Sequence, residues 1–315
     1  MPQLLTLGET MVCFTPDSIG PLRYVTNYTA RIAGAESNVA IGVQKLGCSS
    51  GWIGKLGDDE LGRYILNNIR SEGVDCTHVK IDSQHRTGLM LKQRSSRETS
   101  VFYYRENSAA SFLSPDDLDE SYFNGAEILH LTGITPVLSS SCLQTVNESI
   151  EIAKEKRMLI SFDPNVRKKL WKTTDYSSVI RELTLQADIV LMGLDEAEIL
   201  FHTREINHLF DIILENNPHA LIAVKDGANG SVVGNSAIRK HIEPYPCQRL
   251  ETIGAGDAFN AGFLAGVLQG RDIDICGKMG NIAGALATET PGDIEGQPTA
   301  EQMEAALHHL NTVYR

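Results

Sequence analysis

The sequence predicts an α/β protein whose core is one mostly parallel β-sheet, doubly wound with helices on both faces. Between residues 128 and 225, short apolar runs alternate with segments of helical length and pattern. From residue 255 onward the pattern is almost wholly helical, whereas two β-prone stretches, 12–32 and 87–111, interrupt the first third of the chain. Strands that alternate with helices pair in parallel and are covered on both faces, so the two β-prone stretches are expected to form a separate small sheet.

The first third of the chain supplies the beginning of the predicted main sheet. Residues 4–7 form a short apolar run that predicts a buried strand, and residues 52–53 predict another. Residues 39–46 predict a helix that ends at Gly47, because glycine is favoured just beyond a helix C-terminus. A second helix is expected over 58–69, where acidic residues occupy the first turn as the helix dipole favours.

The small sheet is predicted to be a lid inserted into the larger unit. Within 87–111, residues 89–93 and 101–103 have the pattern of two strands joined by a charged turn at 95–98. Together with residues 12–32 they would form the lid. The rest of the chain is assigned to the larger α/β domain, namely 1–11, 33–86 and 112–315.

From residue 128 the alternation of strand and helix is regular. Strands are expected at 128–131, 159–162, 189–192 and 221–225. Helices are expected between and after them, at 138–156, 176–186, 196–201 and 206–215. A hairpin should follow, and three helices should end the chain: the hairpin strands at 231–233 and 238–242, the helices at 255–269, 273–288 and 301–310.

Composition narrows the classes of function. The formal net charge of −12 at pH 7 disfavours nucleic acid and anionic membranes as partners. No stretch approaches the roughly 20 apolar residues that a membrane span needs. The 6 cysteines are scattered without a Cys-x-x-Cys pair, which is typical of reduced thiols. We therefore expect a cytoplasmic protein that binds neither nucleic acid nor membrane.

The sharpest chemical signal is the sequence Gly254-Ala255-Gly256-Asp257 at the start of a predicted helix of small residues. Glycines let backbone N–H groups converge on a ligand, and a helix N-terminus adds partial positive charge. Such a turn suits a transferring phosphoryl group, whose charge must be stabilised during transfer. The same dipole keeps Asp257 ionised, so that it can accept a proton. Taken alone, the tetrapeptide is a weak signal, because an ordinary turn whose Asp caps and stabilises a helix has the same sequence.

Four short motifs occur in a fixed order along the chain, at residues 33–38, 54–62, 225–230 and 254–257. They resemble the sugar-binding segment, a glycine-rich stretch, the nucleotide-binding turn and the Gly-Ala-Gly-Asp signature of the ribokinase (PfkB) family of carbohydrate kinases. The resemblance covers the whole chain. It implies a ribokinase-like fold in which the larger domain binds nucleotide and the lid closes over the sugar.

The resemblance also implies roles for individual residues. Asp257 would deprotonate a sugar hydroxyl, while the backbone N–H groups of Gly254, Ala255 and Gly256 would hold the transferring phosphate. The residues expected to contact ATP are Asn165, Arg167, Lys225, Gly227, Gly230, Gly254, Gly256 and Asn281. Magnesium would be held mainly through waters, with Glu196 as the carboxylate beside it, and the resemblance allows for a monovalent cation as well.

Two positions depart from the family's pattern. Gly193 stands where the family's Asn-x-x-Glu motif has Asn, although Glu196 is retained. Glu251 replaces the Asp that usually opens the Gly-Ala-Gly-Asp motif. Both departures concern the surroundings of the magnesium ion, and neither alters the phosphate-holding turn.

Two arginines narrow the choice of sugar. Tyr104 and Arg105 end the second lid strand, and Arg167 follows the strand at 159–162. Loops at the carboxyl ends of parallel strands line the ligand crevice. The planar guanidinium fork fits a carboxylate in a bidentate manner, so this arrangement favours a sugar acid. Arg105 could instead be a solvated edge-strand residue, and Arg167 could instead contact the phosphates of ATP.

Three further stretches, 102–105, 129–136 and 163–171, resemble family members that phosphorylate 2-keto-3-deoxygluconate. The implied product is the 6-phosphate. By the same resemblance, the residues that contact the sugar acid would be Gly34, Asn38, Tyr104, Arg105, Arg167, Asp257 and Asp293.

Other functions are possible on the sequence alone. A kinase for a neutral ketose such as fructose is the first alternative, and an inactive sugar- or nucleotide-binding regulator is the second. A nicotinamide oxidoreductase would need Gly-x-Gly-x-x-Gly after the first strand, but Gly8-Glu9-Thr10-Met11 stands there. Open strand edges in the predicted lid favour pairing with a second subunit, so we expect a homo-oligomer.

Overall fold

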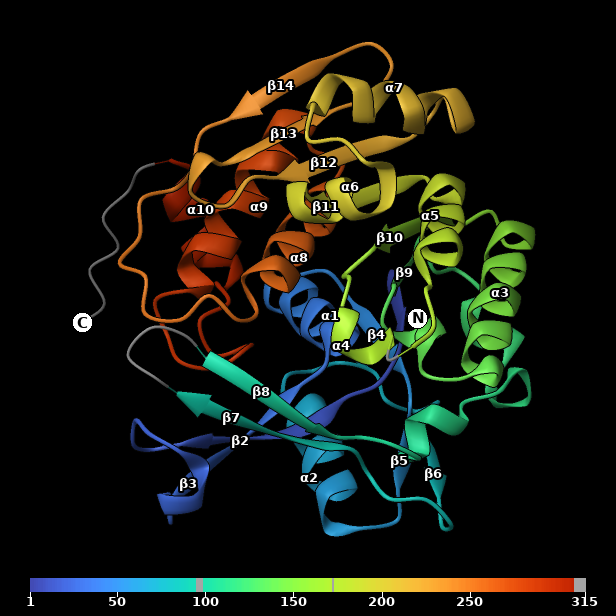
Figure 1. The fold of residues 1–315 in the computed structure, drawn as a ribbon. Helices are drawn as coiled ribbons and strands as arrows, with labels where there is room; N and C mark the ends of the chain where they lie inside the picture. The colour runs from blue at the N-terminus through green and yellow to red at the C-terminus, as the bar shows by residue number, and fades with distance from the viewer. Residues whose placement is uncertain (95–98, 172, 309–315) are drawn as a thin grey trace.

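The computed structural model describes residues 1–94, 99–171 and 173–308, and its largest element is a β-sheet of eight strands in the order β14-β13-β12-β11-β10-β9-β1-β4 (Figure 1). These strands are β1 (Leu4–Leu7), β4 (Ser50–Ile53), β9 (Ile128–Thr132), β10 (Leu159–Asp163), β11 (Ile189–Gly193), β12 (Leu221–Lys225), β13 (Ser231–Gly234) and β14 (Arg239–Ile242). Neighbouring strands from β4 to β12 are parallel, and β13 and β14 add an antiparallel hairpin at one edge. The predicted mostly parallel sheet is confirmed.

Helices cover both faces of this sheet, as predicted. One face packs against α1 (Ala35–Lys45), α8 (Ala255–Leu268), α9 (Ile273–Ala287) and α10 (Ala300–Leu307). The other packs against α3 (Ser140–Glu155), α5 (Ser177–Gln186), α6 (Leu194–Phe201) and α7 (Ile206–Asn216). Successive side chains of a strand point to opposite faces, so Leu191 joins the first cluster and Val190 the second. No helix within the described ranges is both long and apolar enough to cross a bilayer.

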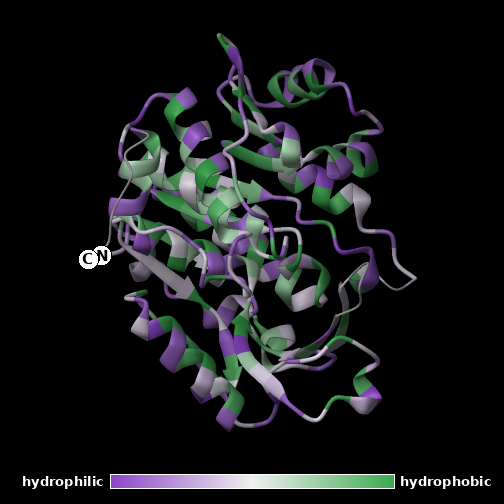
Figure 2. Cartoon of the chain, turned by 90° about the vertical axis from the view of Figure 1, so that its left-hand side faces the viewer, coloured by the Kyte–Doolittle hydropathy of each residue, from purple (hydrophilic) through white to green (hydrophobic). Residues whose placement is uncertain are grey.

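The distribution of hydropathy agrees with this layering. In Figure 2 the strands at the centre of the molecule are mostly hydrophobic, whereas the surrounding helices carry both colours. The parallel strands are buried along most of their length, as β9 illustrates with five buried residues. A strand buried on both faces does not alternate between polar and apolar residues, so these strands appear in the sequence as short apolar runs.

The smaller sheet, which we call the lid, has four strands in the order β3-β2-β7-β8 and lies beneath the larger sheet in Figure 1. Its strands are β2 (Met11–Pro16), β3 (Tyr28–Ala33), β7 (Leu89–Arg94) and β8 (Thr99–Tyr104). The helix α2 (Glu60–Ser71) packs its apolar side against the face of β2 and β3 that bears Val12 and Ile32. The domain boundaries predicted at 12–32 and 87–111 stay a prediction; Met11 and Ala33 of these strands lie one residue outside them.

Several elements differ from the sequence-based expectation. The helix expected from residue 39 begins at Ala35, because its polar first turn is buried and hydrogen-bonded instead of forming a loop. Strand β2, which is central in its sheet, was not singled out because the polar residues Glu9 and Thr10 directly precede its apolar run. A two-stranded sheet of β5 (Lys55–Gly57) and β6 (Lys80–Asp82) was also missed. The predicted turn at 95–98 and the predicted helix end at 310 lie outside the described residues.

Short helical segments complete the chain. The helix α4 (Lys168–Trp171) follows β10 after a short connection. The 3₁₀ segments are η1 (Leu22–Tyr24), η2 (Ala109–Phe112), η3 (Pro115–Asp117), η4 (Glu120–Phe123), η5 (Thr135–Val137) and η6 (Gly227–Asn229).

Candidate active site

A cavity of about 470 Å³ lies between the lid and the larger domain. On the sheet side it is lined by residues at or just beyond the carboxyl ends of the strands: Glu9, Ile134, Asp163 and Lys225. On the lid side it is lined by Met11, Met90, Lys92, Val101, Tyr103 and Arg105. After β1 the chain adds β4 on one side of that strand and later returns to add β9 on the other side, and such reversals of strand order open a ligand crevice in α/β sheets.

The turn at residues 254–257 reaches this cavity at the N-terminus of α8. Gly254 has φ +84°, and a Cβ atom there would lie 2.8 Å from the backbone oxygen of Asp293, so only glycine fits. Gly256 is different, because a Cβ atom there would meet only the Nζ atom of Lys225, at 3.9 Å. Gly256 thus leaves open space at the helix N-terminus, where backbone amides and the dipole favour an anion.

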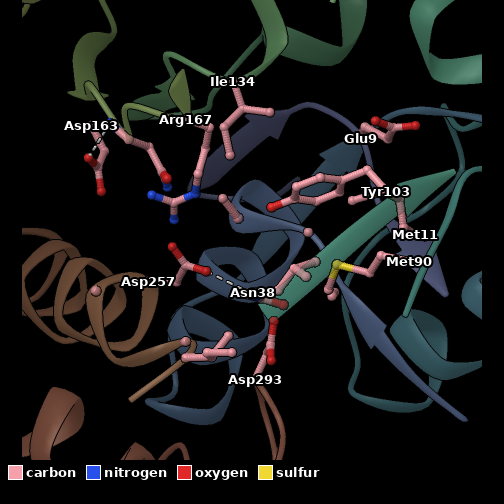
Figure 3. Close-up of a pocket in the computed structure, with 18 of the residues that line it drawn as sticks. Glu9, Met11, Asn38, Met90, Tyr103, Ile134, Asp163, Arg167, Asp257 and Asp293 are labelled. Atoms are coloured by element: carbon pink, nitrogen blue, oxygen red, sulfur yellow. Dashed lines mark hydrogen bonds between the residues drawn. The ribbon is translucent and has the colours of Figure 1, made fainter. Parts of the chain in front are cut away.

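Asp257 lies on the first turn of α8 and faces the cavity (Figure 3). Its Oδ2 atom accepts a hydrogen bond of 2.8 Å from Nδ2 of Asn38, on α1. Burial raises the pKa of Asp257 to about 7, and the nearby carboxylate of Asp163 raises it further, whereas the Asn38 hydrogen bond and the charge of Arg167 oppose the shift. Asp257 is therefore only partly ionised near neutral pH, in contrast to the expectation that the helix dipole keeps it ionised, because burial favours its neutral form. A carboxylate with a pKa near neutrality can both accept and release a proton at physiological pH.

Lys225 ends β12 and presents its ammonium group to the same turn. Its Nζ atom lies 2.9 Å from Oδ2 of Asp163 and 3.1 Å from Oδ1 of Asn260. Burial alone would raise the pKa of Asp163, but the Lys225 charge and the Asn260 hydrogen bond hold it below its usual value. Asp163 therefore stays ionised and fixes the direction of the Lys225 ammonium group.

Glu196 lines the cavity from the first turn of α6. Its two carboxylate oxygens accept hydrogen bonds from the backbone N–H groups of Val166, at 2.9 Å, and Gly193, at 2.8 Å. Burial raises the pKa of Glu196, and the neighbouring Asp163 adds to the rise. The described residues contain no group of three or more His, Cys, Asp or Glu side chains that could hold a metal ion, so a metal here would depend on ligand or water oxygens.

Arg105 lines the cavity at the end of the lid strands and is 9% exposed. Its guanidinium group forms an ion pair with Glu9, which follows β1. Its Nε atom is buried and has no hydrogen-bond partner among the described residues. Part of the guanidinium fork thus remains available to an acceptor on a ligand.

Tyr103, and not Tyr104, contributes to the cavity. Tyr104 is 61% exposed on the opposite face of β8, whereas the ring of Tyr103 lines the cavity with Arg105 5.7 Å from its centroid. Neighbouring residues of a strand point to opposite faces, so an error of one residue reverses the assignment. The placement of Tyr104 therefore corrects the sequence-based choice.

Four other predicted sugar or nucleotide residues lie at the cavity: Gly34, Asn165, Arg167 and Asp293. Figure 3 shows Arg167 extending toward Asp257 from the loop after β10. Asn165 adopts φ +39°, and its buried Oδ1 atom has no hydrogen-bond partner within the described part of the chain. A Cβ atom at Gly34 would lie 2.6 Å from the backbone oxygen of Glu9, so this position requires glycine.

Besides Tyr104, four of the predicted residues do not line the cavity: Ala255, Gly227, Gly230 and Asn281. The N–H group of Ala255 donates to the Thr252 carbonyl at 3.4 Å. The side-chain amide of Asn281 donates to the carbonyl oxygens of Ile242 and Glu243, at 3.1 and 2.9 Å. The contact of Ala255 with the transferring phosphate and the contacts of Gly227, Gly230 and Asn281 with ATP stay predictions.

Several residues that the fold brings to this cavity were not predicted from the sequence. Asp163 ends an apolar strand, and a carboxylate in that position is a signal that could have identified it. Tyr103, Lys92 and Glu9 had no comparable signal, because a polar residue on a lid strand or after β1 is equally consistent with exposure to solvent.

The chain is similar to known proteins along almost its whole length, including the lid. Residues 1–300 match the model described as pfkB family carbohydrate kinase. The chain is 35% identical over 315 residues to a 2-dehydro-3-deoxygluconokinase of Bacillus subtilis (strain 168), covering 99% of this chain and 97% of that protein. A PfkB protein from Polaromonas sp. JS666 has a TM-score of 0.88 at 33% identity, covering 97% of this chain and 100% of that chain. A fructokinase from Vibrio cholerae O395, solved with fructose, ADP and calcium ion bound, has a TM-score of 0.87 at 26% identity, covering 98% of this chain and 99% of that chain.

Proposed function

The chain belongs to the pfkB family of carbohydrate kinases, and we propose that it transfers the γ-phosphoryl group of ATP to 2-keto-3-deoxygluconate, a sugar acid, to give the 6-phosphate. One observation carries the proposal: Asp257 faces the cavity on the first turn of α8, directly beside the open space at Gly256. Its carboxylate is also close enough to the Lys225 ammonium group for their charges to interact. The similarity to the Bacillus subtilis enzyme, which has the same substrate in its name, supports the choice of sugar.

In the proposed reaction, Asp257 accepts the proton of the sugar's 6-hydroxyl group. The hydroxyl oxygen then bonds to the γ-phosphorus as the bond from that phosphorus to the bridging oxygen of ADP breaks. The amides at the N-terminus of α8 and the Lys225 ammonium group would stabilise the negative charge on the transferring group. The pKa of about 7 suits Asp257 to this task near neutral pH.

The residues present fit a nucleotide phosphate with its magnesium ion. Gly256 leaves the space that a phosphate would need, and the Lys225 ammonium group borders that space. Glu196 would hold Mg²⁺ through water, since both of its oxygens already accept backbone hydrogen bonds. When bound, Mg²⁺ would neutralise part of the phosphate charge. The Vibrio cholerae fructokinase, which was solved with ADP and a divalent cation, supports this assignment.

The sugar acid would lie between the turn and the lid. Arg105 would share its guanidinium group between Glu9 and the substrate carboxylate, to which the unpartnered Nε–H can donate. Tyr103 would supply a hydroxyl group to a sugar oxygen, and the buried Oδ1 of Asn38, which lacks a partner among the described residues, would accept from a sugar hydroxyl. Met11 and Met90 give the same wall an apolar part, which suits the deoxygenated carbon of this substrate.

A neutral ketose kinase is the second candidate, and the similarity to a fructokinase favours it. Purified protein should be assayed for ADP release with Mg²⁺, ATP and either 2-keto-3-deoxygluconate or fructose. We expect a much higher kcat/KM for the sugar acid. Arg105→Ala should lower kcat/KM for the acid by roughly 10-fold or more, the worth of a charge-assisted hydrogen bond, and should affect fructose far less. Faster turnover of fructose than of the acid by the wild-type protein would overturn the assignment.

We also propose that the lid takes part in homo-oligomerisation. Strand β8 is an edge of the lid sheet, and its residues Phe102 and Tyr104 are 44% and 61% exposed. Exposed apolar side chains on an open strand edge favour pairing with another copy. Light scattering coupled to gel filtration at micromolar concentration should give the mass of at least a dimer, and a monomer mass would contradict this proposal.

A further inference from the structure

Lys92 is a lid residue whose ammonium group is buried against the larger domain. It lies on β7, is 1% exposed, and belongs to the cavity-lining residues of the lid. Its Nζ atom lies 3.1 Å from Oε1 of Glu251 and 3.1 Å from Oδ1 of Asp293. A lysine is almost never fully buried unless its charge is paired, and here two carboxylates of the larger domain compensate one lid cation.

These two carboxylates belong to the segments that bracket the turn at residues 254–257. Glu251 precedes Gly254 by three residues, and its backbone N–H donates to the Thr288 carbonyl at 3.1 Å. Asp293 touches the turn directly, because a Cβ atom at Gly254 would lie 2.8 Å from its backbone oxygen and 2.9 Å from its Cα atom. Any displacement of these segments relative to each other would therefore move Gly254, which opens the helix that carries Asp257.

Lys92 reaches both segments from a different domain. The contacts join residues 159 and 201 positions apart in the sequence. Without the ammonium group, the buried carboxylate of Asp293 and the partly buried carboxylate of Glu251 would face each other, and their mutual repulsion would separate the segments. The ion-pair cluster is thus complete only when the lid rests on the larger domain.

We propose that Lys92 is a positioning residue for phosphoryl transfer: it draws Glu251 and Asp293 together from the lid and thereby fixes the turn at residues 254–257. Lid closure is in this way coupled to assembly of the phosphate-holding turn. The proposal rests on the function proposed above for the turn, but its structural part, the coupling of lid and turn, holds for any ligand.

The chain offers a matched control in a second ion pair between lid and larger domain. Nε of Arg31, on β3, lies 3.0 Å from Oε1 of Glu295, in the same segment as Asp293. Arg31 does not line the cavity, and the atoms nearest to a Cβ atom at Gly254 belong to Asp293 and not to Glu295, the partner of Arg31. Arg31→Met therefore removes a more exposed ion pair of the lid while leaving the contacts of Lys92 with Glu251 and Asp293 intact.

The test compares Lys92→Met, Glu251→Gln and Arg31→Met with the wild-type protein in steady-state kinetics. Lys92→Met should lower kcat by about 10-fold or more, since small misplacements of a reacting group are costly, while the KM for ATP changes by less than about threefold. Glu251→Gln, which keeps the Lys92–Asp293 pair and leaves no unpaired buried cation, should give a smaller loss in kcat. Arg31→Met should stay within about twofold of the wild type.

Hydrogen exchange of the peptide that covers residues 252–257 provides a readout that needs no substrate. Lys92→Met should speed exchange in this peptide several-fold, and Arg31→Met should not. If the wild type phosphorylates no sugar, the proposed function fails while this exchange result still decides the role of Lys92. Unchanged exchange and unchanged kcat in folded Lys92→Met, or equal losses in Arg31→Met, would overturn the proposal. If Lys92→Met does not fold, the same outcomes in Glu251→Gln decide.

Discussion

The pH dependence of turnover tests the role of Asp257. Its pKa is raised to about 7 by burial and by the carboxylates of Asp163 and Asp293. Only the ionised form can accept the substrate proton, so kcat/KM should follow the ionised fraction. The rate should be level above pH 8, half of that value near pH 7, and about one tenth of it near pH 6. An ordinary aspartate with a pKa of 3.8 would give a level profile over this range.

Asn38→Ala should move this profile in a defined direction. The hydrogen bond of 2.8 Å from Asn38 stabilises the charged form of Asp257 and lowers its pKa. A hydrogen bond to a charged group contributes about 1.5–3 kcal/mol, and 1.36 kcal/mol corresponds to one pKa unit. Loss of the bond should therefore raise the inflection by about one to two pH units, so that the variant reaches its full rate only in alkaline buffer.

The assay is ADP release at saturating Mg²⁺ and ATP between pH 5.5 and 9.5, in buffers of constant ionic strength. The KM for ATP, measured at each pH, separates titration of the protein from titration of the nucleotide. A wild-type profile without an inflection between about pH 6 and 8 would refute the assigned pKa. An unchanged inflection in Asn38→Ala would refute the contribution of the hydrogen bond.

Two further predictions concern the turn and the stability of the protein. Gly254→Ala should destabilise the folded state by about 1–3 kcal/mol, because φ is +84° at this position and a methyl group would meet Asp293. Gly256→Ala should keep the wild-type Tm but weaken ATP binding, because its methyl group would fill the open space at the helix N-terminus. Thermal unfolding and nucleotide titration of the pair would check this, and equal Tm losses would contradict it. Asp257→Asn should increase the free energy of unfolding at pH 8 by about 1–3 kcal/mol, since burial disfavours the charged aspartate. This gain should shrink toward pH 5, because Asp257 of the folded wild type takes up a proton as the pH falls through its pKa of about 7, whereas in the unfolded chain its pKa is 3.8 and it stays ionised. Urea titrations at pH 8 and pH 5 would measure the change in the free energy of unfolding.

Much of the fold could be predicted from the sequence because its strands are buried on both faces. Runs such as those of β9 to β12 appear as short apolar stretches between helical patterns, and each was confirmed within about two residues. Strand β2 carries the same burial but stands next to polar residues, so its run was hidden. The match of residues 1–300 to one family agrees with the predicted architecture.

The candidate site was predictable only where its chemistry is local. The turn at residues 254–257 carries its glycines and its carboxylate within four positions. The hydrogen-bond partner of that carboxylate, Asn38, lies 219 positions away in the sequence, and only the folded structure brings the two side chains together. For the same reason, Lys92 cannot be told from a solvated strand lysine in the sequence, and only the structure shows its ion pairs with Glu251 and Asp293.

The choice between Tyr103 and Tyr104 shows a second limit. Both stand in one polar-aromatic run at the end of β8, and the sequence does not fix which of them points inward. Which of the two tyrosines points inward depends on the pairing of β8 with β7, which places Tyr103 opposite Met90 on the cavity side. Register of this kind follows from tertiary contacts that a single strand does not encode.

Turnover by Asp257→Asn at pH 8, measured together with ATP affinity, tests the central claim most directly. Asparagine keeps the shape of the side chain and can still accept the Asn38 hydrogen bond, but it cannot take the proton of the sugar. We expect kcat to fall by about 10²-fold or more while the Kd for ATP stays near that of the wild type. Near-normal turnover would contradict the account, because the carboxylate beside the turn would then not be the base.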